Sequence, residues 1–116
     1  MSQENFDSSE ANPRLPDNIE DLENDELKAL VIENLKNGGS SNETALKTLV
    51  VWTSRKEREA RTGEDRVRFE IERSDLYFEA DLHDEGVQAL EDALFVANME
   101  GIEALIDEIE KKWKNL

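Results

Sequence analysis

The spacing of apolar residues changes along this chain, and this change restricts what the chain can fold into. Between residues 24 and 53 apolar residues recur every three or four positions, which is typical of amphipathic helices. Between residues 67 and 82 they alternate with polar residues, which is typical of strands with one buried face. Helical spacing returns from residue 85 onward. We therefore predict an α+β protein with an N-terminal αα-hairpin, a two-stranded antiparallel β-hairpin and a long or broken C-terminal helix.

The first two helices are predicted from their apolar stripes and from the residue types at their ends. The first helix is expected to begin near Asn24 or Asp25 and to end at Asn37-Gly38-Gly39, where left-handed backbone is favoured. One of the polar residues 40–42 (Ser, Ser, Asn) then caps the second helix. The predicted buried faces are Leu27, Leu30, Val31 and Leu35 in the first helix, and Leu46, Leu49, Val50 and Thr53, with Ala45 and Trp52 beside them, in the second.

The alternating segment is interpreted as two strands joined by a polar turn. Val67, Phe69 and Ile71 form one apolar face, and Leu76, Phe78, Ala80 and Leu82 form the other. A four-residue loop over residues 72–75 places Arg68 opposite Glu79 and Arg66 opposite Asp81. A two-residue loop would instead place Glu70 opposite Glu79. Because opposite charges across a strand pair stabilise it and like charges destabilise it, we predict the longer loop.

The C-terminal third contains two similar segments, EGVQALEDAL at 85–94 and EGIEALIDEI at 100–109. Their offset of 15 residues rotates the apolar stripe by about 60° on a straight helix, so we predict a break near Asn98 to Gly101, with Asn98 as a cap. Either a true repeat or common helix chemistry explains the similarity. A heptad-like seam, which either packs within the chain or forms a dimer, comprises Phe95, Met99, Ile102, Ile106, Ile109 and Trp113.

Length and composition add the domain organisation. The chain has 116 residues, a number that fits one domain, and a formal net charge of −15. Residues 1–18 are polar and are predicted to form a disordered acidic tail, which leaves residues 19–116 as a single small α+β domain. The sequence shows neither a secretory signal nor a membrane-spanning apolar run, so we expect a cytoplasmic protein that does not bind membranes. It contains no cysteine, which excludes disulfides and thiolate zinc sites.

The charges are distributed unevenly. Both ends of the chain are strongly acidic, whereas residues 47–73 carry more bases than acids. The bases of this middle segment are mostly arginines, which suit recognition of phosphate or carboxylate groups. These bases are candidates for binding an anion or nucleic acid. Alternatively, they pair with the chain's own acids, and we favour this second interpretation. The candidate residues are Arg55, Lys56, Arg58, Arg61, Arg66 and Arg68.

The sequence offers little for catalysis. It has one histidine, no cysteine and no phosphate-loop or nucleophile motif, so we predict that the protein is not an enzyme and needs no cofactor. Glu79, Asp81 and His83 alternate and have the chemistry to bind a divalent ion. Their spacing matches no metal-binding motif, and such alternation is common on exposed strand faces, so we predict no metal site.

Two functions follow from these features. The first is an acidic adaptor or regulator, such as an inhibitor, an immunity protein or a chaperone, that binds a basic protein surface by charge and an apolar patch. Its predicted contact acids are Glu79, Asp81, Glu85, Glu91 and Asp92. The alternative is a winged-helix regulator that binds DNA through the arginine-rich segment 55–68 and uses the β-hairpin as its wing. Both a monomer and a homodimer are compatible with the sequence.

Overall fold

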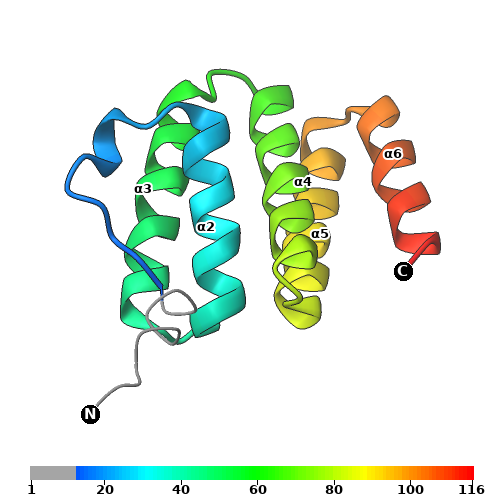
Figure 1. Ribbon diagram of the computed structural model, residues 1–116. Coiled ribbons are helices and arrows are strands. Elements are labelled where there is room, and N and C mark those ends of the chain that lie inside the picture. The colour runs from blue at the N-terminus through cyan, green and yellow to red at the C-terminus, as the bar shows by residue number, and fades with distance from the viewer. Residues whose placement is uncertain (1–12) are drawn as a thin grey trace, which may run out of the picture. The chain divides into compact units, whose positions relative to one another are not determined.

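The computed structural model describes residues 13–116, and these residues form helices and no strand. They contain a short 3₁₀ helix, η1 (Ile19–Asp21), and five α-helices (Figure 1). The α-helices are α2 (Asn24–Gly38), α3 (Glu43–Glu59), α4 (Gly63–Glu79), α5 (His83–Glu100) and α6 (Glu103–Lys114). The predicted α+β fold class is therefore wrong, and the described chain is all-helical. Most of the predicted disordered tail, residues 1–12, lies outside the described residues.

The chain divides into two compact units, with the boundary between Thr53 and Ser54 in the middle of α3. The first unit contains α2 and the first part of α3, which correspond to the two predicted N-terminal helices. α2 buries its predicted stripe, and the side chain of Asn42, one of the predicted caps, accepts a hydrogen bond of 3.0 Å from the backbone N–H of Ala45. α2 begins at Asn24, one of its two predicted starts, and its N-cap is Glu23, which forms a capping box with Glu26.

The predicted buried face of α3 is wrong. α3 buries Ala45, Thr48 and Trp52, whereas Leu46 and Val50 are exposed. Relative to the prediction, the helix is rotated by about 100°. Thr48 tolerates burial because its hydroxyl donates to the carbonyl of Ala45 at 2.8 Å. The prediction counted apolar residues only. It therefore overlooked that Thr48 can be buried with its hydroxyl hydrogen-bonded, and it selected the wrong face of the helix.

The predicted β-hairpin is also wrong, because both of its strands lie largely in the single helix α4. Successive helical residues are about 100° apart, so Val67 and Ile71 lie on one face and Phe69 and Leu76 on the opposite face. All four side chains are buried. A helix buried on two opposite faces thus reproduces the alternation of a strand. The expected pairs of Arg68 with Glu79 and of Arg66 with Asp81 do not form; Arg68 instead contacts Glu64 at 3.1 Å on the same helix.

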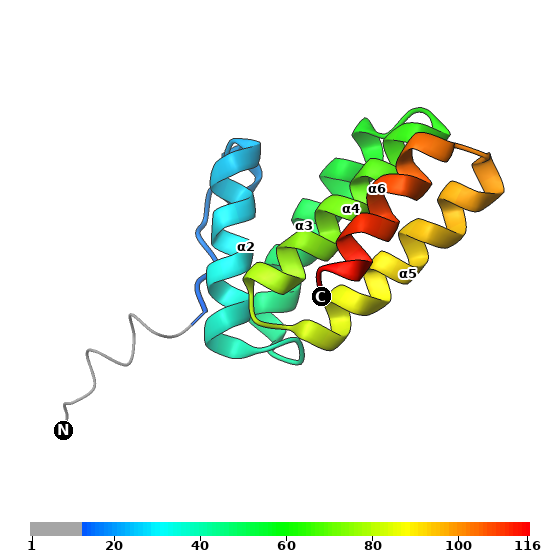
Figure 2. The same cartoon turned by 90° about the vertical axis from the view of Figure 1, so that its right-hand side faces the viewer.

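The second unit is built on close packing between α4 and α5, with α6 against both (Figure 2). Its core cluster consists of Val67, Ile71, Leu90, Ala93, Ala97, Leu105 and Ile109. The face of α5 toward α4 is made largely of small residues. Gly86 lies against the ring of Phe78, and its carbonyl accepts a hydrogen bond of 2.9 Å from the buried hydroxyl of Ser74. This contact fixes the two helices at the α4–α5 turn.

The ends of α4 and α5 share one motif. After α4, the N–H of Leu82 donates to the carbonyl of Tyr77, and Asp81 has a φ of 65°. After α5, the N–H of Ile102 donates to the carbonyl of Ala97, and Gly101 has a φ of 69°. Both ends are Schellman motifs, in which the left-handed residue reverses the chain.

The predicted break near Asn98 to Gly101 is confirmed, since α5 ends at Glu100 and α6 begins at Glu103. Asn98 does not cap α6, because its amide donates to the carbonyl of Leu94 within α5. The two similar segments are not structurally equivalent. Gly86 of the first is buried inside α5, whereas Gly101 of the second terminates that helix.

Gly86→Ala should destabilise the protein despite the higher helix propensity of alanine. A Cβ atom at this position would lie 2.7 Å from carbons of the Phe78 ring, so the ring or the helix has to move. Overpacking of this kind costs about 1–3 kcal/mol, against about 1 kcal/mol gained from helix propensity. Urea unfolding followed by circular dichroism measures the difference. In a Phe78→Leu background the same substitution should cost less, and an equal cost in both backgrounds would contradict this explanation.

Asp81→Gly and Gly101→Ala should have opposite effects on stability. Glycine adopts the left-handed conformation without the steric cost that other residues incur, so Asp81→Gly should raise the free energy of unfolding by up to about 1 kcal/mol. Gly101→Ala should lower it by about 1 kcal/mol or more. Both values are measurable by thermal and urea unfolding. A loss of stability in Asp81→Gly would show that the Asp81 side chain stabilises the turn.

Candidate functional site

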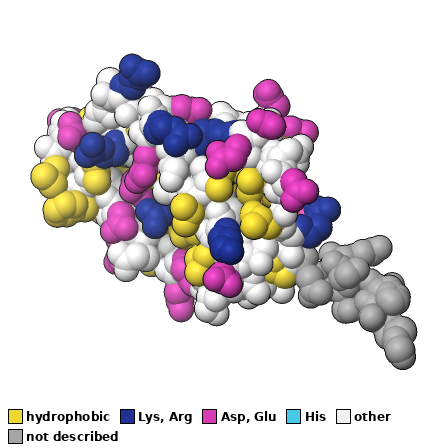
Figure 3. All heavy atoms as spheres, turned by 90° about the vertical axis from the view of Figure 1, so that its left-hand side faces the viewer, with side chains coloured by type: hydrophobic (Ala, Val, Ile, Leu, Met, Phe, Trp, Pro, Cys, Tyr) yellow, Lys and Arg dark blue, Asp and Glu magenta, His cyan; other side chains and the backbone are white. Residues whose placement is uncertain are grey.

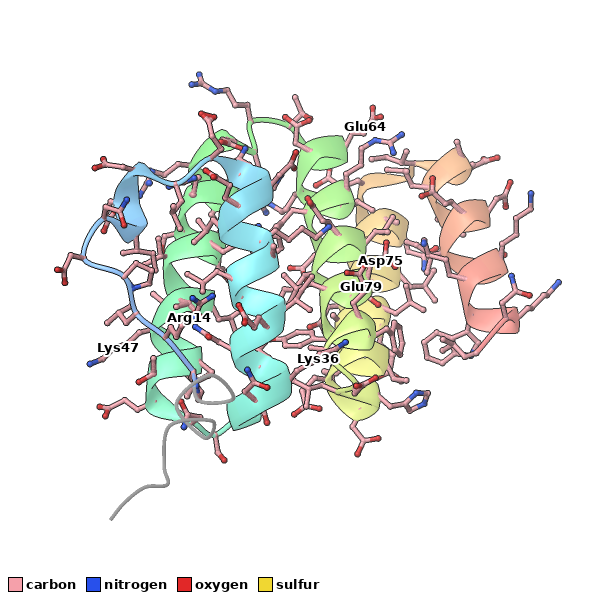
Figure 4. The ribbon with its side chains drawn as sticks, viewed as in Figure 1. Arg14, Lys36, Lys47, Glu64, Asp75 and Glu79 are labelled. Carbon is pink, nitrogen blue, oxygen red and sulfur yellow. The ribbon has the colours of Figure 1, made fainter. Side chains whose placement is uncertain are left out.

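The five predicted contact acids fall into two groups. Glu79, labelled in Figure 4, ends α4, and Asp81 and Glu85 follow in the turn and in the first turn of α5. Glu91 and Asp92 lie in the middle of α5. Glu79, Asp81 and Glu91 are exposed, and the other two are partly buried. The structure therefore spreads these acids from the α4–α5 turn along α5 and does not collect them at one point.

Helix electrostatics distinguish the acids near the turn. Carboxylates favour the positive N-terminal end of a helix and are disfavoured at its negative C-terminal end. Asp84 and Glu85 lie in the first turn of α5, where the helix stabilises them. Glu79 lies in the last turn of α4, which contains no base. Glu79 therefore adds negative potential at a place where its charge does not stabilise the helix.

Residues on one face of α5 form a continuous surface, which we call the α5 stripe. It consists of Gln88, the adjacent acids Glu91 and Asp92, Phe95 and Met99, and its other steps are three or four residues. The amide of Gln88 donates to Asp92 at 3.2 Å, which orients that carboxylate. Phe95 is 65% exposed and Met99 is 72% exposed. The stripe thus begins with acids and ends with two large apolar side chains in solvent.

The predicted heptad-like seam is divided by the structure. Ile109 is buried in the core, and Ile102 and Ile106 are partly buried against it. Phe95, Met99 and Trp113 are exposed. The break at Gly101 separates the α5 part from the α6 part, so the seam is not one continuous interface. Only its α5 part is available to a partner together with the acids.

The arginine-rich set lies around the α3–α4 connection. Arg55, Lys56 and Arg58 belong to α3, Arg61 to the connection, and Arg66 and Arg68 to α4. Lys56 and Arg68 form ion pairs with acids of the same unit. The Nζ atom of Lys56 lies 3.0 Å from Glu72, and Arg68 contacts Glu64 at 3.1 Å and Glu108 at 4.0 Å. This pairing supports the interpretation that the bases offset the chain's own acids.

Charges of both signs are interspersed on the surface. On the face drawn in Figure 3, Lys and Arg side chains alternate with Asp and Glu side chains, with apolar side chains between them. Two surface depressions flank Phe69, and their walls also combine both signs. One is lined by Lys56, Glu59, Ala60, Asp65, Arg68, Phe69 and Glu72, and the other by Glu57, Ala60, Arg66, Phe69 and Glu70. Acids line both depressions, so neither is the uniformly basic surface that favours binding of a nucleic-acid backbone.

Two carboxylates of the second unit have shifted pKa values. Burial raises the pKa of Glu70, which Arg73 lowers through an ion pair of 3.2 Å, while the nearby charges of Asp92 and Glu57 raise it. The pKa of Asp65 is lowered chiefly because the backbone N–H of Arg61 donates to its carboxylate, and hydrogen bonding with Thr62 lowers it further. Burial therefore disfavours the charged form of Glu70 in the folded protein.

The residues considered for metal binding do not form a ligand set. Glu79, Asp81 and His83 lie at the end of α4, in the turn and at the start of α5. Among residues 13–116 no three histidine or acidic side chains are arranged to hold an ion. The ring of His83 instead lies 5.5 Å from that of Phe78.

One feature of the first unit was missed by sequence reasoning. Asn34 is fully buried in α2 and hydrogen-bonds the backbone of Arg14, twenty residues earlier in the chain. The signal was present in the sequence, because Asn34 occupies a position that continues the apolar stripe of α2. A polar residue at a core position requires a partner, and the partner here is a backbone segment.

Comparisons with known proteins place the chain in no family. No protein-family model matches it, and searches of curated proteins and of solved structures return no match.

In the part of the chain that the structure describes, no helix is both long and apolar enough to cross a bilayer.

Glu70→Gln should make the protein more stable at pH 7 and change how its stability depends on pH. The pKa of Glu70 is raised in the folded state from its ordinary value of 4.5. At pH values above 4.5 the folded protein therefore binds more protons than the unfolded chain. The free energy of unfolding therefore falls as pH rises from about 4.5 toward the folded pKa, and the variant lacks this loss. Urea unfolding from pH 3.5 to 7 measures the free energy of unfolding of both proteins. The difference between the two free energies should vanish below pH 4. A variant less stable at pH 7 would show that the ion pair with Arg73 dominates.

Proposed function

We propose that this chain is a non-enzymatic adaptor or regulator that binds a basic, partly apolar protein surface through the α5 stripe. The observation that carries the proposal is the position of Phe95 and Met99, which are mostly exposed and continue the line of Glu91 and Asp92 on one helix face. Apolar side chains of this size contribute affinity when a partner buries them, and the adjacent acids select a partner of opposite charge.

The overall charge supports this proposal. A net charge of −15 attracts basic partners over distances of about a Debye length and raises their association rate. The acids near the α4–α5 turn extend the negative surface beyond the stripe. The partner that fits best is an amphipathic helix with bases on one side and apolar residues on the other, because it complements both parts of the stripe.

The DNA-binding alternative has less support. Its wing was the predicted β-hairpin, and the described residues contain no strand. Lys56 and Arg68, two of its six basic contacts, already lie against acids of the same unit. A cytoplasmic location and the choice between monomer and homodimer remain predictions from the sequence, and the proposal depends on neither.

A synthetic 18-residue amphipathic helical peptide of lysine and leucine serves as the probe, with its affinity measured by fluorescence anisotropy. Phe95→Ser with Met99→Ser should weaken binding tenfold or more, because each buried side chain contributes about 1.5–3 kcal/mol. Glu91→Lys with Asp92→Lys should also weaken it and should reduce its dependence on salt. All four side chains are at least partly exposed, so the variants should fold.

Matched control variants test whether the affinity for the peptide depends on the α5 stripe itself or only on the net charge and exposed apolar surface of the protein. Asp107→Lys with Glu110→Lys changes the net charge equally on α6, and Val50→Ser removes an apolar side chain that is 59% exposed on α3. Neither should lower the affinity as much as the variants of the stripe. Equal losses in the two charge-reversal variants, or affinity that is unchanged between low and high salt, would refute the proposal.

A further inference from the structure

The segment Pro13-Arg14-Leu15-Pro16-Asp17-Asn18, which we call the strap, lies beside α2 in the first unit, where Figure 4 labels Arg14. The side-chain amide of Asn34 holds its backbone at two points. The Nδ2 atom donates to the carbonyl of Arg14 at 2.6 Å, and the Oδ1 atom accepts from the N–H of Arg14 at 2.9 Å. Two such bonds to one residue are what a neighbouring β-strand provides. Asn34 therefore binds backbone, independently of the side chain that this backbone carries.

The side chains of the strap add a recognisable chemistry. The guanidinium of Arg14 lies 2.7 Å from the carboxylate of Glu33. Pro13 lies so close to Gly38 that a Cβ atom there would be 2.6 Å from its Cγ atom. A surface depression remains beside the strap, lined by Arg14, Pro16, Leu22, Glu26, Ala29, Leu30 and Glu33. The strap thus places a basic residue flanked by prolines at the wall of this acidic, partly apolar depression, which we call the groove.

The strap is held more weakly by its side chains than by its backbone. Arg14 and Glu33 are 59% and 44% exposed, and ion pairs in that environment contribute little. The side chain of Leu15 is 45% exposed. If the strap left, Asn34 would lose both hydrogen bonds to the backbone of Arg14 and would keep the 3.5 Å contact with Thr48. These two bonds are made to backbone atoms, so any extended segment can supply them.

We propose that the strap is the displaceable internal occupant of a peptide-docking groove on the first unit. Its occupant from another protein is an extended segment in which one base is flanked by prolines, the chemistry of residues 13–16. Asn34 would bind the backbone of that segment, and Glu33 and Glu26 would select its base. This inference concerns a different unit from the α5 stripe and does not depend on the function proposed above.

The test uses the full-length chain and a labelled peptide of sequence Asn-Pro-Arg-Leu-Pro-Asp-Asn. The wild-type chain should bind it weakly, because the tethered strap competes at an effective concentration in the millimolar range. Arg14→Glu places the strap against Glu33 with like charge, and this variant should bind the peptide about two- to fivefold more tightly, the range expected when an exposed ion pair is lost. When the peptide saturates the variant, the NMR signals of the Asn34 side-chain amide should shift.

A charge exchange tests the same groove without changing the strap. Glu33→Arg repels the chain's own Arg14 and should prefer a peptide with glutamate in place of arginine. Arg58→Glu is the matched control, since it changes the net charge as Arg14→Glu does but lies on α3 outside the groove. Dispersed amide spectra confirm that each variant folds. The proposal is overturned if Arg14→Glu binds no better than Arg58→Glu, if Glu33→Arg shows no preference for the exchanged peptide, or if the Asn34 signals stay unmoved.

Discussion

The contact between α4 and α5 is the constraint on which the second unit depends. Small residues on α5 allow the two helices to pack closely. The hydroxyl of Ser74 on α4 links them by donating a hydrogen bond to the carbonyl of Gly86 on α5. Because this packing uses one face of α5 and α6 also packs against the helix, the opposite face remains in solvent. Phe95 and Met99 lie on this exposed face, although large apolar side chains of their kind are usually buried in a core. The exposed surface of α5 is thus a consequence of how closely its other side is packed.

The sequence predicted much of the helical framework but not the fold class. α2 was correct to within one residue at its start, and the end of α5 was correct because Gly101 is suited to a left-handed helix end. α4 was missed because period-two hydrophobicity has two physical causes, and only one of them is a strand. A short helix buried on both sides gives the same pattern, and single-sequence spacing does not separate the two. The many glutamates and arginines of α4 favoured a helix, and propensity deserved more weight there.

The candidate site was also predicted from the sequence only in part. Glu91 and Asp92 were predicted from the sequence as contact acids, but the sequence offered no means of knowing that Phe95 and Met99 would share their face in solvent. Exposure depends on which side of α5 packs, and that is a tertiary property. The basic set was easier to interpret. The interleaved acids led us to expect that the bases pair within the chain, but the partner was wrong for Arg68, which contacts Glu64 on its own helix and not Glu79.

Asn34 shows why a polar residue within an apolar stripe is informative. A buried amide without partners is costly, so the chain must bring donors and acceptors to it. Thr48 supplies one distant contact, and the backbone of Arg14 supplies the two short ones. A leucine at this position would bury more apolar surface and would hold no strap. The asparagine therefore exchanges core hydrophobicity for the ability to bind an extended backbone, and that ability does not distinguish the chain's own segment from one that another protein supplies.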